Sequence, residues 1–307
     1  MKIPLLTVCL ITYNHKEYIR KAIEGVVMQK VDFDYELLIA DDFSTDGTRD
    51  ILLEYKEKYP EIIKLILQEK NVSAAKNWIE LLTTAKGKYI AYFEGDDYWI
   101  DPNKLQKQVD FLEANPKYVC HCHNALIIEK NKPEKFYNNN KSDKVLTTDD
   151  IVTTLSIPTG SVVFRNCLRP FPSYLKKFPL DIILYFALSK FGDFYQSTEV
   201  MSVYRIHEGG IWSEQSPLKK LNENIKIKRF YLNEMPLNQI QKRMVKQSIV
   251  NVKLNRLKFF ANTQFLSYNY FQDFIYLLYY KCLLYKFSLK FFIFCICPDN
   301  FIKLFKK

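Results

Sequence analysis

The chain has 307 residues, 48% of them hydrophobic and 25% charged, a composition that excludes a disordered protein and allows a sizeable core in one or two domains. Its formal net charge of +10 is uneven, because residues 214–307 hold 17 Lys or Arg against 5 Asp or Glu, whereas residues 1–213 hold 27 against 29. The seven cysteines lack the paired spacing of a disulfide framework, and no secretory signal pattern is visible, so we expect a cytoplasmic protein.

Apolar runs alternate with amphipathic segments through the first 115 residues. We predict strands over residues 5–12, 35–40, 62–67 and 88–93, and helices over residues 15–29, 49–58, 71–85 and 102–114. Four such alternations are typical of a parallel, doubly wound sheet. The predicted fold class is therefore α/β, with a Rossmann-like, mostly parallel sheet flanked by helices.

The pattern loosens after Pro116. Strands are predicted over residues 118–129, 159–165 and 199–204, and a helix over residues 181–190. From about Pro217 onward nearly every segment is typical of helices. The aromatic stretch over residues 274–304 has no uncharged run longer than residues 291–298, whereas a bilayer span needs about 20 residues. We expect this stretch to be an amphipathic anchor lying in the membrane plane, or a helix packed on the main domain or on another subunit.

Two acidic clusters stand where predicted strands end. Asp41 and Asp42 follow one strand, and Glu94, Asp96 and Asp97 follow another. Loops at the carboxyl ends of strands line the ligand crevice of an open α/β sheet. Carboxylates gathered there repel each other unless a cation lies between them, and such oxygen ligands suit Mg²⁺ or Mn²⁺ carrying a phosphate-bearing substrate. Either cluster alone could instead cap a helix or lie in a loop, but together they favour a divalent metal and a nucleotide.

Several motifs occur in a fixed order along the chain. They are VCLITYN at Val8–Asn14, DDFSTDGT at Asp41–Thr48, EGDDYW at Glu94–Trp99, and then Asp101-Pro102 and Lys104-Leu105. Together they resemble the inverting family 2 glycosyltransferases of bacterial type, whose nucleotide-sugar-binding fold is called GT-A. A further stretch, YRIHEGGIWS at Tyr204–Ser213, resembles the motif that closes the catalytic domain in bacterial members.

The resemblance implies a domain organisation. It predicts a GT-A catalytic domain over residues 1–213, divided into a nucleotide-sugar-binding half, residues 1–115, and an acceptor-binding half, residues 116–213. A helical, basic and aromatic region is expected over residues 214–307.

The resemblance also implies roles for individual residues. Glu94, Asp96 and Asp97 occupy the metal-binding DxD motif, with Glu in place of the first Asp, and which of Asp96 and Asp97 touches the metal is open. Asp41 and Asp42 match the acidic pair that reads the nucleoside. The residues implied to bind the nucleotide sugar are Thr12, Tyr13, Asn14, Asp41, Asp42, Asn71, Lys76, Glu94, Asp96 and Arg205, and those implied to bind Mg²⁺ or Mn²⁺ are Asp96, Asp97 and His207. The metal would stabilise the negative charge of the leaving diphosphate.

Inversion needs a general base that removes the acceptor proton while the acceptor oxygen attacks from the face opposite the leaving group. The family places this aspartate at the start of a helix before the closing motif, which points to Asp181, although Leu180 replaces the acidic or glycine residue common before it. An N-cap aspartate is the structural alternative for Asp181. His207, with Arg205, could contact the diphosphate, the metal or the acceptor, or could be a structural histidine.

The sequence thus predicts a hexosyl- or related transferase that moves a sugar from a nucleotide-sugar donor, UDP-linked as the first choice, to a saccharide or lipid-linked acceptor in surface polysaccharide synthesis. The basic tail predicts peripheral contact with the cytoplasmic leaflet of the inner membrane or oligomerisation through the C-terminal helices, and no nucleic acid is expected. One alternative is Mg²⁺-dependent phosphoryl transfer, which would need a phosphate-accepting Asp after the first strand, where Thr12-Tyr13-Asn14 stand. Another is a non-enzymatic protein whose tail binds membrane or nucleic acid.

Overall fold

The computed structural model describes residues 3–153, 157–210, 212, 214–263, 269 and 271–277. The chain divides into two compact units, residues 1–208 and residues 209–307, which are described separately. The domain boundary expected after residue 213 and the division into two functional halves stay predictions.

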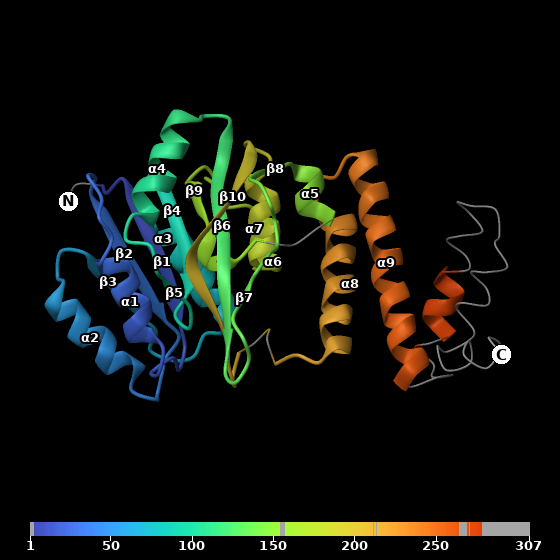
Figure 1. The fold of residues 1–307 in the computed structure, drawn as a ribbon, viewed down its shortest axis with the longest axis horizontal. Coiled ribbons are helices and arrows are strands. Elements are labelled where there is room, and N and C mark those ends of the chain that lie inside the picture. The colour runs from blue at the N-terminus through green and yellow to red at the C-terminus, as the bar shows by residue number, and fades with distance from the viewer. Residues whose placement is uncertain are drawn as a thin grey trace. The chain divides into compact units, whose positions relative to one another are not determined.

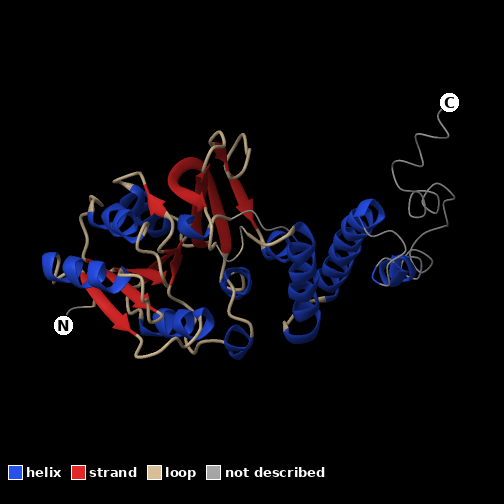
Figure 2. Ribbon diagram, turned by 90° about the horizontal axis from the view of Figure 1, so that it is seen from below, coloured by secondary structure: helices blue, strands red, loops and turns tan. Residues whose placement is uncertain are grey.

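The first unit is an α/β unit with helices on both sides of a sheet (Figures 1 and 2). Its strands are β1 (Leu6–Thr12), β2 (Tyr35–Asp41), β3 (Ile63–Leu67), β4 (Tyr89–Glu94), β5 (Tyr98–Trp99), β6 (Tyr118–Glu129), β7 (Lys135–Phe136), β8 (Lys144–Leu146), β9 (Val163–Arg165) and β10 (Asp193–Ile206). Its helices are α1 (Ile19–Val27), α2 (Thr48–Lys58), α3 (Ala74–Thr84), α4 (Lys104–Ala114), α5 (Thr148–Thr153), the 3₁₀ turn η1 (Thr159–Ser161), α6 (Ser173–Lys177) and α7 (Asp181–Leu188).

All these strands form one mixed sheet, in the order β3-β2-β1-β4-β9-β6-β10-β5, with β7 beside β6 and β8 beside β10. Pairing is parallel between β1 and β2, β1 and β4, β2 and β3, and β6 and β10, and these pairs hold most of the paired residues. The mostly parallel α/β fold is therefore confirmed. A wholly parallel sheet is not formed, because the short strands β5, β7, β8 and β9 pair antiparallel.

Several predicted elements differ from the observed ones at their ends. The helix expected from residue 15 begins at Ile19, after a turn in which the Ile19 amide donates to the His15 carbonyl. The helix expected from residue 71 begins at Ala74, because Ser73 has a φ of 84°. The strand expected over residues 159–165 is divided into η1 and β9. The last predicted strand starts earlier, since β10 already begins at Asp193.

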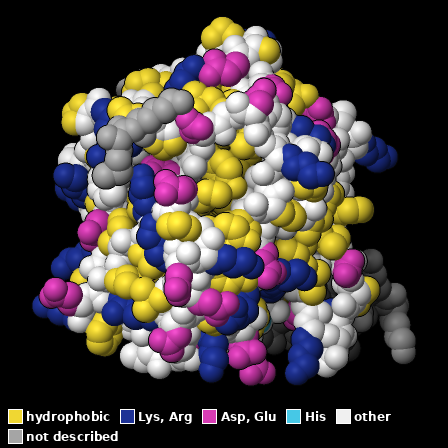
Figure 3. Space-filling view, turned by 90° about the vertical axis from the view of Figure 1, so that its left-hand side faces the viewer, with side chains coloured by type: hydrophobic (Ala, Val, Ile, Leu, Met, Phe, Trp, Pro, Cys, Tyr) yellow, Lys and Arg dark blue, Asp and Glu magenta, His cyan; other side chains and the backbone are white. Residues whose placement is uncertain are grey.

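The core of the first unit surrounds its central strand. Leu6, Val8 and Leu10 of β1 are fully buried and belong to one apolar cluster with residues of α1, α2 and α4. The intervening residue Cys9 is buried as well, as expected for a strand covered on both faces. On the face drawn in Figure 3, Lys and Arg side chains are interspersed with Asp and Glu, in line with the near-neutral charge of residues 1–213. The core therefore holds the carboxyl ends of β1, β2 and β4 in fixed register.

The second unit contains α8 (Pro217–Glu234), α9 (Gln239–Thr263) and a short helical segment over residues 271–277. The buried carboxylate of Asp273 accepts hydrogen bonds from Lys253 Nζ (2.5 Å) and from Arg256 Nε and Nη2 (2.5 and 2.6 Å). These ion pairs fasten the short segment to α9, and the helical character predicted after Pro217 is confirmed here. Most of the amphipathic stretch expected over residues 274–304 lies outside the described residues. Among the residues that are described, no helix is long and apolar enough to cross a bilayer.

Candidate active site

The first acidic cluster lies at the carboxyl end of β2. Asp41 is fully buried, and its carboxylate accepts hydrogen bonds from the Ser44 amide (3.1 Å), the Ser44 hydroxyl and Arg49 Nε (2.6 Å). These contacts fix the loop between β2 and α2. They give Asp41 a structural task, while its predicted contact with a nucleoside stays a prediction.

Asp42 joins three segments at the edge of the sheet. Its amide donates to the Thr12 carbonyl (3.1 Å) at the end of β1, and its Oδ1 accepts from the Val72 amide (2.7 Å) before α3. Asn71 Nδ2 donates to the Asp42 carbonyl (3.3 Å). The second carboxylate oxygen of Asp42 accepts no hydrogen bond from the residues that the structure describes. Asp42 is therefore better placed than Asp41 to accept a hydrogen bond from a ligand.

The residues around the end of β1 have different surroundings. Asn14 has a φ of 54°, and its side chain accepts from the Thr45 amide (2.9 Å), so it joins β1 to the loop after β2. Thr12 is buried, with its hydroxyl 3.3 Å from His15 Nδ1. Tyr13 is 45% exposed, and Lys76 lies on the exposed side of α3. The binding roles of these residues remain predictions.

Replacing Arg49 with Ala is expected to destabilise the protein by about 3–5 kcal/mol, because the buried Asp41 carboxylate would lose its cation. Arg20→Ala is the matched control, since Arg20 also forms an ion pair with a carboxylate, that of Glu54, but at the surface. Chemical denaturation of the two variants measures the difference. An equal, small loss of stability in both would contradict the structural task of Asp41.

The second acidic cluster follows β4 in a tight turn. The Gly95 amide donates to the Ile11 carbonyl (2.9 Å), and the Asp97 amide donates to the Glu94 carbonyl (3.1 Å). A Cβ atom at Gly95 would lie 2.9 Å from Thr12 Oγ1 and 3.0 Å from His15 Nδ1, so this close approach requires glycine. The turn thereby places Glu94 and Asp96 beside the end of β1.

The Asp96 carboxylate contacts His207, the residue that directly follows β10. The distance from His207 Nε2 to Asp96 Oδ2 is 3.1 Å, and His207 Nδ1 lies 2.8 Å from the Glu208 carbonyl oxygen, which assigns a proton to Nδ1. Although burial opposes ionisation, the hydrogen bond from His207 and the charge of His15 lower the pKa of Asp96. The same hydrogen bond raises the pKa of His207. Asp96 Oδ1 is buried without a partner in the described structure.

Asp97 faces a different group. Its Oδ1 accepts from the Arg205 amide (2.9 Å), and Arg205 Nη1 donates to the Asp96 carbonyl (2.5 Å). The Arg205 guanidinium also lies over the Tyr98 ring, 4.3 Å from its centroid. Burial, and then the charge of Asp96, raise the pKa of Asp97 well above its usual range. Asp97 therefore attaches β10 to the acidic turn.

The three predicted metal ligands are thus not gathered into one ligand set. Asp96 and His207 meet, whereas Asp97 turns to the backbone of Arg205. Within the described residues, no three or more His, Cys, Asp or Glu side chains are arranged to hold an ion. The pair still fits a divalent cation, because Asp96 Oδ1 is an orphaned buried acceptor and Mg²⁺ commonly takes one or two carboxylates together with substrate phosphates.

Asp181 is the first residue of α7. The N-cap position belongs to Leu180, so the N-cap alternative for Asp181 is wrong. Its Oδ1 accepts from the Ile182 amide (2.7 Å), and its Oδ2 accepts from the Thr159 hydroxyl (3.2 Å). Burial raises the pKa of Asp181. Asp181 also helps, after burial and the two aspartates of the turn, to raise the pKa of Glu94 well above its usual range, so it lies in the field of the second acidic cluster.

Two residues of this region are absent from the sequence prediction. His15 and Tyr18 form a ring cluster with His207, in which the Tyr18 and His207 centroids are 4.3 Å apart. Their position just after the first motif, where a strand ends, was the available signal. Thr159, the hydroxyl donor to Asp181, belongs to the segment Thr159–Ser161, which the family resemblance implies borders the acceptor pocket.

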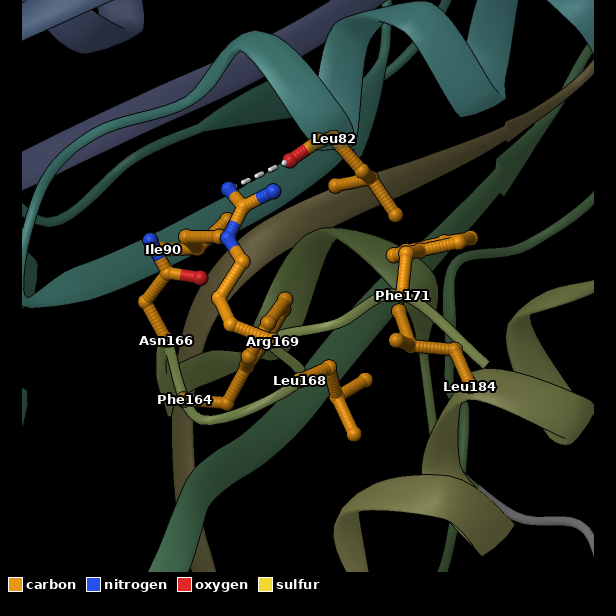
Figure 4. Close-up of a pocket in the computed structure, with 8 residues that line it drawn as sticks. All are labelled: Leu82, Ile90, Phe164, Asn166, Leu168, Arg169, Phe171 and Leu184. Carbon is orange, nitrogen blue, oxygen red and sulfur yellow. Dashed lines mark hydrogen bonds between the residues drawn. The ribbon is translucent and has the colours of Figure 1, made fainter. Parts of the chain in front are cut away.

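A small apolar pocket lies among α3, β4, β9 and α7, and shares no residue with these clusters (Figure 4). Its one charged lining residue, Arg169, donates hydrogen bonds to the carbonyl oxygens of Leu82 (3.3 Å) and Ala85 (2.8 Å) at the end of α3. Since its guanidinium is engaged by the backbone, the pocket lacks a free charged group that could orient a substrate.

Comparison with known proteins relates this geometry to a family. The sequence profile described as "Glycosyl transferase family 2" matches residues 7–171. An uncharacterized protein of Mycobacterium tuberculosis is 36% identical over 212 residues, which are 67% of this chain and 60% of that protein. The putative teichuronic acid biosynthesis glycosyltransferase TuaG of Bacillus subtilis is 40% identical over 109 residues, 36% of this chain and 42% of its own.

Solved structures share the fold. The structure of S. aureus TarS 1–349 in complex with UDP-GlcNAc matches with a TM-score of 0.63 at 19% identity, over 87% of this chain and 79% of that one. The mannosyltransferase PcManGT from Pyrobaculum calidifontis, in complex with GDP-Man and Mn²⁺, matches with a TM-score of 0.58 at 14% identity, over 94% and 77%. The sequence profile covers more than half of the chain, and the chain therefore belongs to glycosyl transferase family 2, with the GT-A fold.

Proposed function

We propose that the chain is an inverting glycosyltransferase that moves a hexosyl or related sugar from a UDP-linked donor to a saccharide or lipid-linked acceptor in surface polysaccharide synthesis. The observation that carries this proposal is the hydrogen bond between Asp96 and His207. It lies close to Glu94, and burial together with the charges of Asp96 and Asp181 raises the pKa of that carboxyl. The likeness to a protein named for teichuronic acid biosynthesis and to a structure with UDP-GlcNAc supports it. Family membership leaves phosphoryl transfer without a supporting observation.

Asp96 and His207 would hold a divalent cation, Mg²⁺ or Mn²⁺. When bound, such an ion supplies Lewis-acid stabilisation of the charge that develops on the leaving diphosphate. Arg205 adds a fixed positive charge beside the same turn, held by the Asp96 carbonyl and the Tyr98 ring. The fold of a mannosyltransferase that binds GDP-Man and Mn²⁺ supports this assignment.

The remaining residues divide the other tasks. Asp42 has a carboxylate oxygen that can accept a hydrogen bond from the base, and the Glu94 carboxylate, which accepts no hydrogen bond from the described residues, can accept one from a donor hydroxyl. Asp181 accepts the proton of the acceptor hydroxyl. The acceptor oxygen bonds to the anomeric carbon as the bond from that carbon to the diphosphate oxygen breaks, with inversion of configuration.

A panel of nucleotide sugars tests the proposal. We expect one UDP-sugar to release UDP in the presence of Mn²⁺ or Mg²⁺, and release to fall to background when EDTA removes the ion. Product anomers assigned by NMR should be opposite to those of the donor. Release that EDTA leaves unchanged would contradict the metal assignment, and retained configuration would contradict the mechanism.

The location of the protein and its assembly are further proposals. A net charge of +12 over residues 214–307 supports peripheral contact with the cytoplasmic face of the membrane, and oligomerisation through the C-terminal helices is the other proposal for this region. Co-sedimentation with anionic but not zwitterionic vesicles, lost at high salt, would support contact with the membrane. A concentration-dependent mass in light scattering without vesicle binding would instead support assembly.

A further inference from the structure

The turn η1 carries the hydroxyl that contacts Asp181. Thr159 Oγ1 donates to Asp181 Oδ2 (3.2 Å), and the other carboxylate oxygen accepts from the Ile182 amide. The hydrogen bond from the Ile182 amide fixes only Oδ1 of the Asp181 carboxylate. The direction of the second oxygen therefore depends on where η1 holds Thr159.

Buried side chains hold two successive carbonyl groups of η1. Trp99 Nε1 donates to the Gly160 carbonyl (2.9 Å), and Gln108 Nε2 donates to the Ser161 carbonyl (2.9 Å). The Ser161 hydroxyl closes the turn by donating to the Pro158 carbonyl (2.6 Å). Because Trp99 and Gln108 are themselves almost fully buried, the turn has little freedom to move.

One buried lysine lies between these two side chains. Lys104 is fully buried, its Nζ donates to Gln108 Oε1 (2.7 Å), and the same atom lies 4.0 Å from the centroid of the Trp99 ring. Among the described residues no carboxylate lies within hydrogen-bond distance of Nζ, and burial lowers the pKa of Lys104 to about 7. The contacts of its amino group are the Gln108 amide oxygen and the face of the Trp99 ring. Lys104 thereby fixes both groups that hold η1.

We propose that Thr159 is a positioning residue for the general base Asp181, and that Lys104, Trp99 and Gln108 form the rigid support that presents it. This inference rests on the proposed function, in which Asp181 takes the acceptor proton. Geometry carries it, since each link from Lys104 to the turn and from the turn to the base is a contact between named atoms.

The Thr159 hydrogen bond should also affect the protonation of Asp181. Burial raises the pKa of this carboxyl, and the bonds from the Ile182 amide and from Thr159 partly offset that rise. The other titratable groups that face Asp181 are Glu94 and Tyr92 of β4, Tyr137 after β7, and Tyr185 of α7. In the described structure none of the four donates a hydrogen bond to the Asp181 carboxylate, whose side-chain donor is Thr159.

Thr159→Val removes the hydroxyl while keeping the shape of the side chain. In the full chain, a ¹³C carboxyl NMR titration, with the Asp181 signal assigned by its loss in Asp181→Asn, should give a pKa higher by about one than in the parent. Thr159→Ser should restore the parent value. Thr83→Val, which removes a hydroxyl bound within α3, is the matched control and should change nothing.

Trp99→Phe tests the support. It keeps a ring over Lys104 but removes the indole N–H that holds the Gly160 carbonyl, so the pKa of Asp181 should move in the same direction by a smaller amount. A Thr159→Val protein with the parent pKa would overturn the positioning role. A Trp99→Phe protein with the parent pKa would overturn the support while leaving Thr159 in place.

Activity measurements can distinguish a failure of the positioning role of Thr159 from a failure of the proposed function. With the UDP-sugar that the panel identifies, Thr159→Val should lower kcat and move the acid limb of the pH profile upward, with KM for the donor unchanged. If Asp181→Asn remains active, the proposed base is wrong. If Asp181→Asn is inactive and Thr159→Val keeps the parent profile, the proposed function stands and the positioning role fails.

Discussion

Asp96→Asn is expected to lower kcat by about 10²–10³-fold and to abolish Mn²⁺ binding in the presence of UDP, whereas Asp97→Asn should keep its Mn²⁺ affinity close to that of the parent. The two residues are adjacent and chemically identical, so the contrast depends on geometry alone. Asp96 offers one carboxylate oxygen to His207 and one orphaned oxygen, while Asp97 accepts from the Arg205 amide. An asparagine oxygen can still accept that bond, so Asp97→Asn should also fold.

Isothermal titration calorimetry with Mn²⁺, at fixed UDP, measures the Mn²⁺ affinities of the variants, and UDP release measures their kcat. His207→Ala should weaken Mn²⁺ binding as well, because it removes the group that meets Asp96. Near-parent affinity in Asp96→Asn combined with lost affinity in Asp97→Asn would reverse the assignment. Equal losses in both variants would indicate that the turn acts as one unit and that the contact with Arg205 does not set Asp97 apart.

The first half of the fold could be predicted from the sequence because its patterns are local. The apolar run that forms β1 and the acidic residues after β2 and β4 appear as strand followed by turn, and parallel pairing then brings these ends together, with Thr12 opposite Asp41 and Ile11 opposite Glu94. The antiparallel strands could not be predicted in the same way. β5 has two residues, Tyr98 and Trp99, and is a strand only because β10 lies beside it.

The residues of the site could be predicted from the sequence, but the contacts that each of them makes could not. The sequence left Asp96 and Asp97 equivalent, and the difference arises from β10, whose Arg205 and His207 are more than a hundred residues away along the chain. Asp41 shows the same limit, since its carboxylate is engaged by Ser44 and Arg49, residues whose side-chain directions no motif reports. A contact that depends on tertiary structure has no periodic signal in the sequence.

Asp181→Asn is expected to lower kcat for transfer by about 10²–10⁴-fold while leaving donor binding near the parent value, because only proton removal from the acceptor is lost. Asp193→Asn is the control, since Asp193 is the other aspartate near α7 and lies at the start of β10. Steady-state kinetics with the acceptor varied, together with UDP binding, separates the two effects. Equal rates for Asp181→Asn and the parent would contradict the assignment of the base.

Although Asp181→Asn should lower turnover, it should increase the stability of the folded protein at neutral pH. Because burial raises the pKa of Asp181 in the folded protein, the folded state holds its proton at pH values where the unfolded state, with a pKa of about 3.9, has lost it. Stability therefore falls as the pH rises from the unfolded pKa through the folded pKa, and the parent bears the whole cost above both. Asp181→Asn lacks this dependence, so its gain in Tm over the parent should be absent near pH 4 and reach a plateau at neutral pH.

Thermal unfolding of both proteins from about pH 4 to about pH 8 measures that gain. A gain that shrinks as the pH rises would mean that the carboxylate is stabilised by its surroundings and that its pKa is not raised. The expected combination of lost turnover and increased stability is informative, because a residue kept only for packing would lose stability when replaced. An ionised carboxylate that costs stability at neutral pH, with one oxygen aimed by the Thr159 hydroxyl, is a group whose retention the fold alone does not explain.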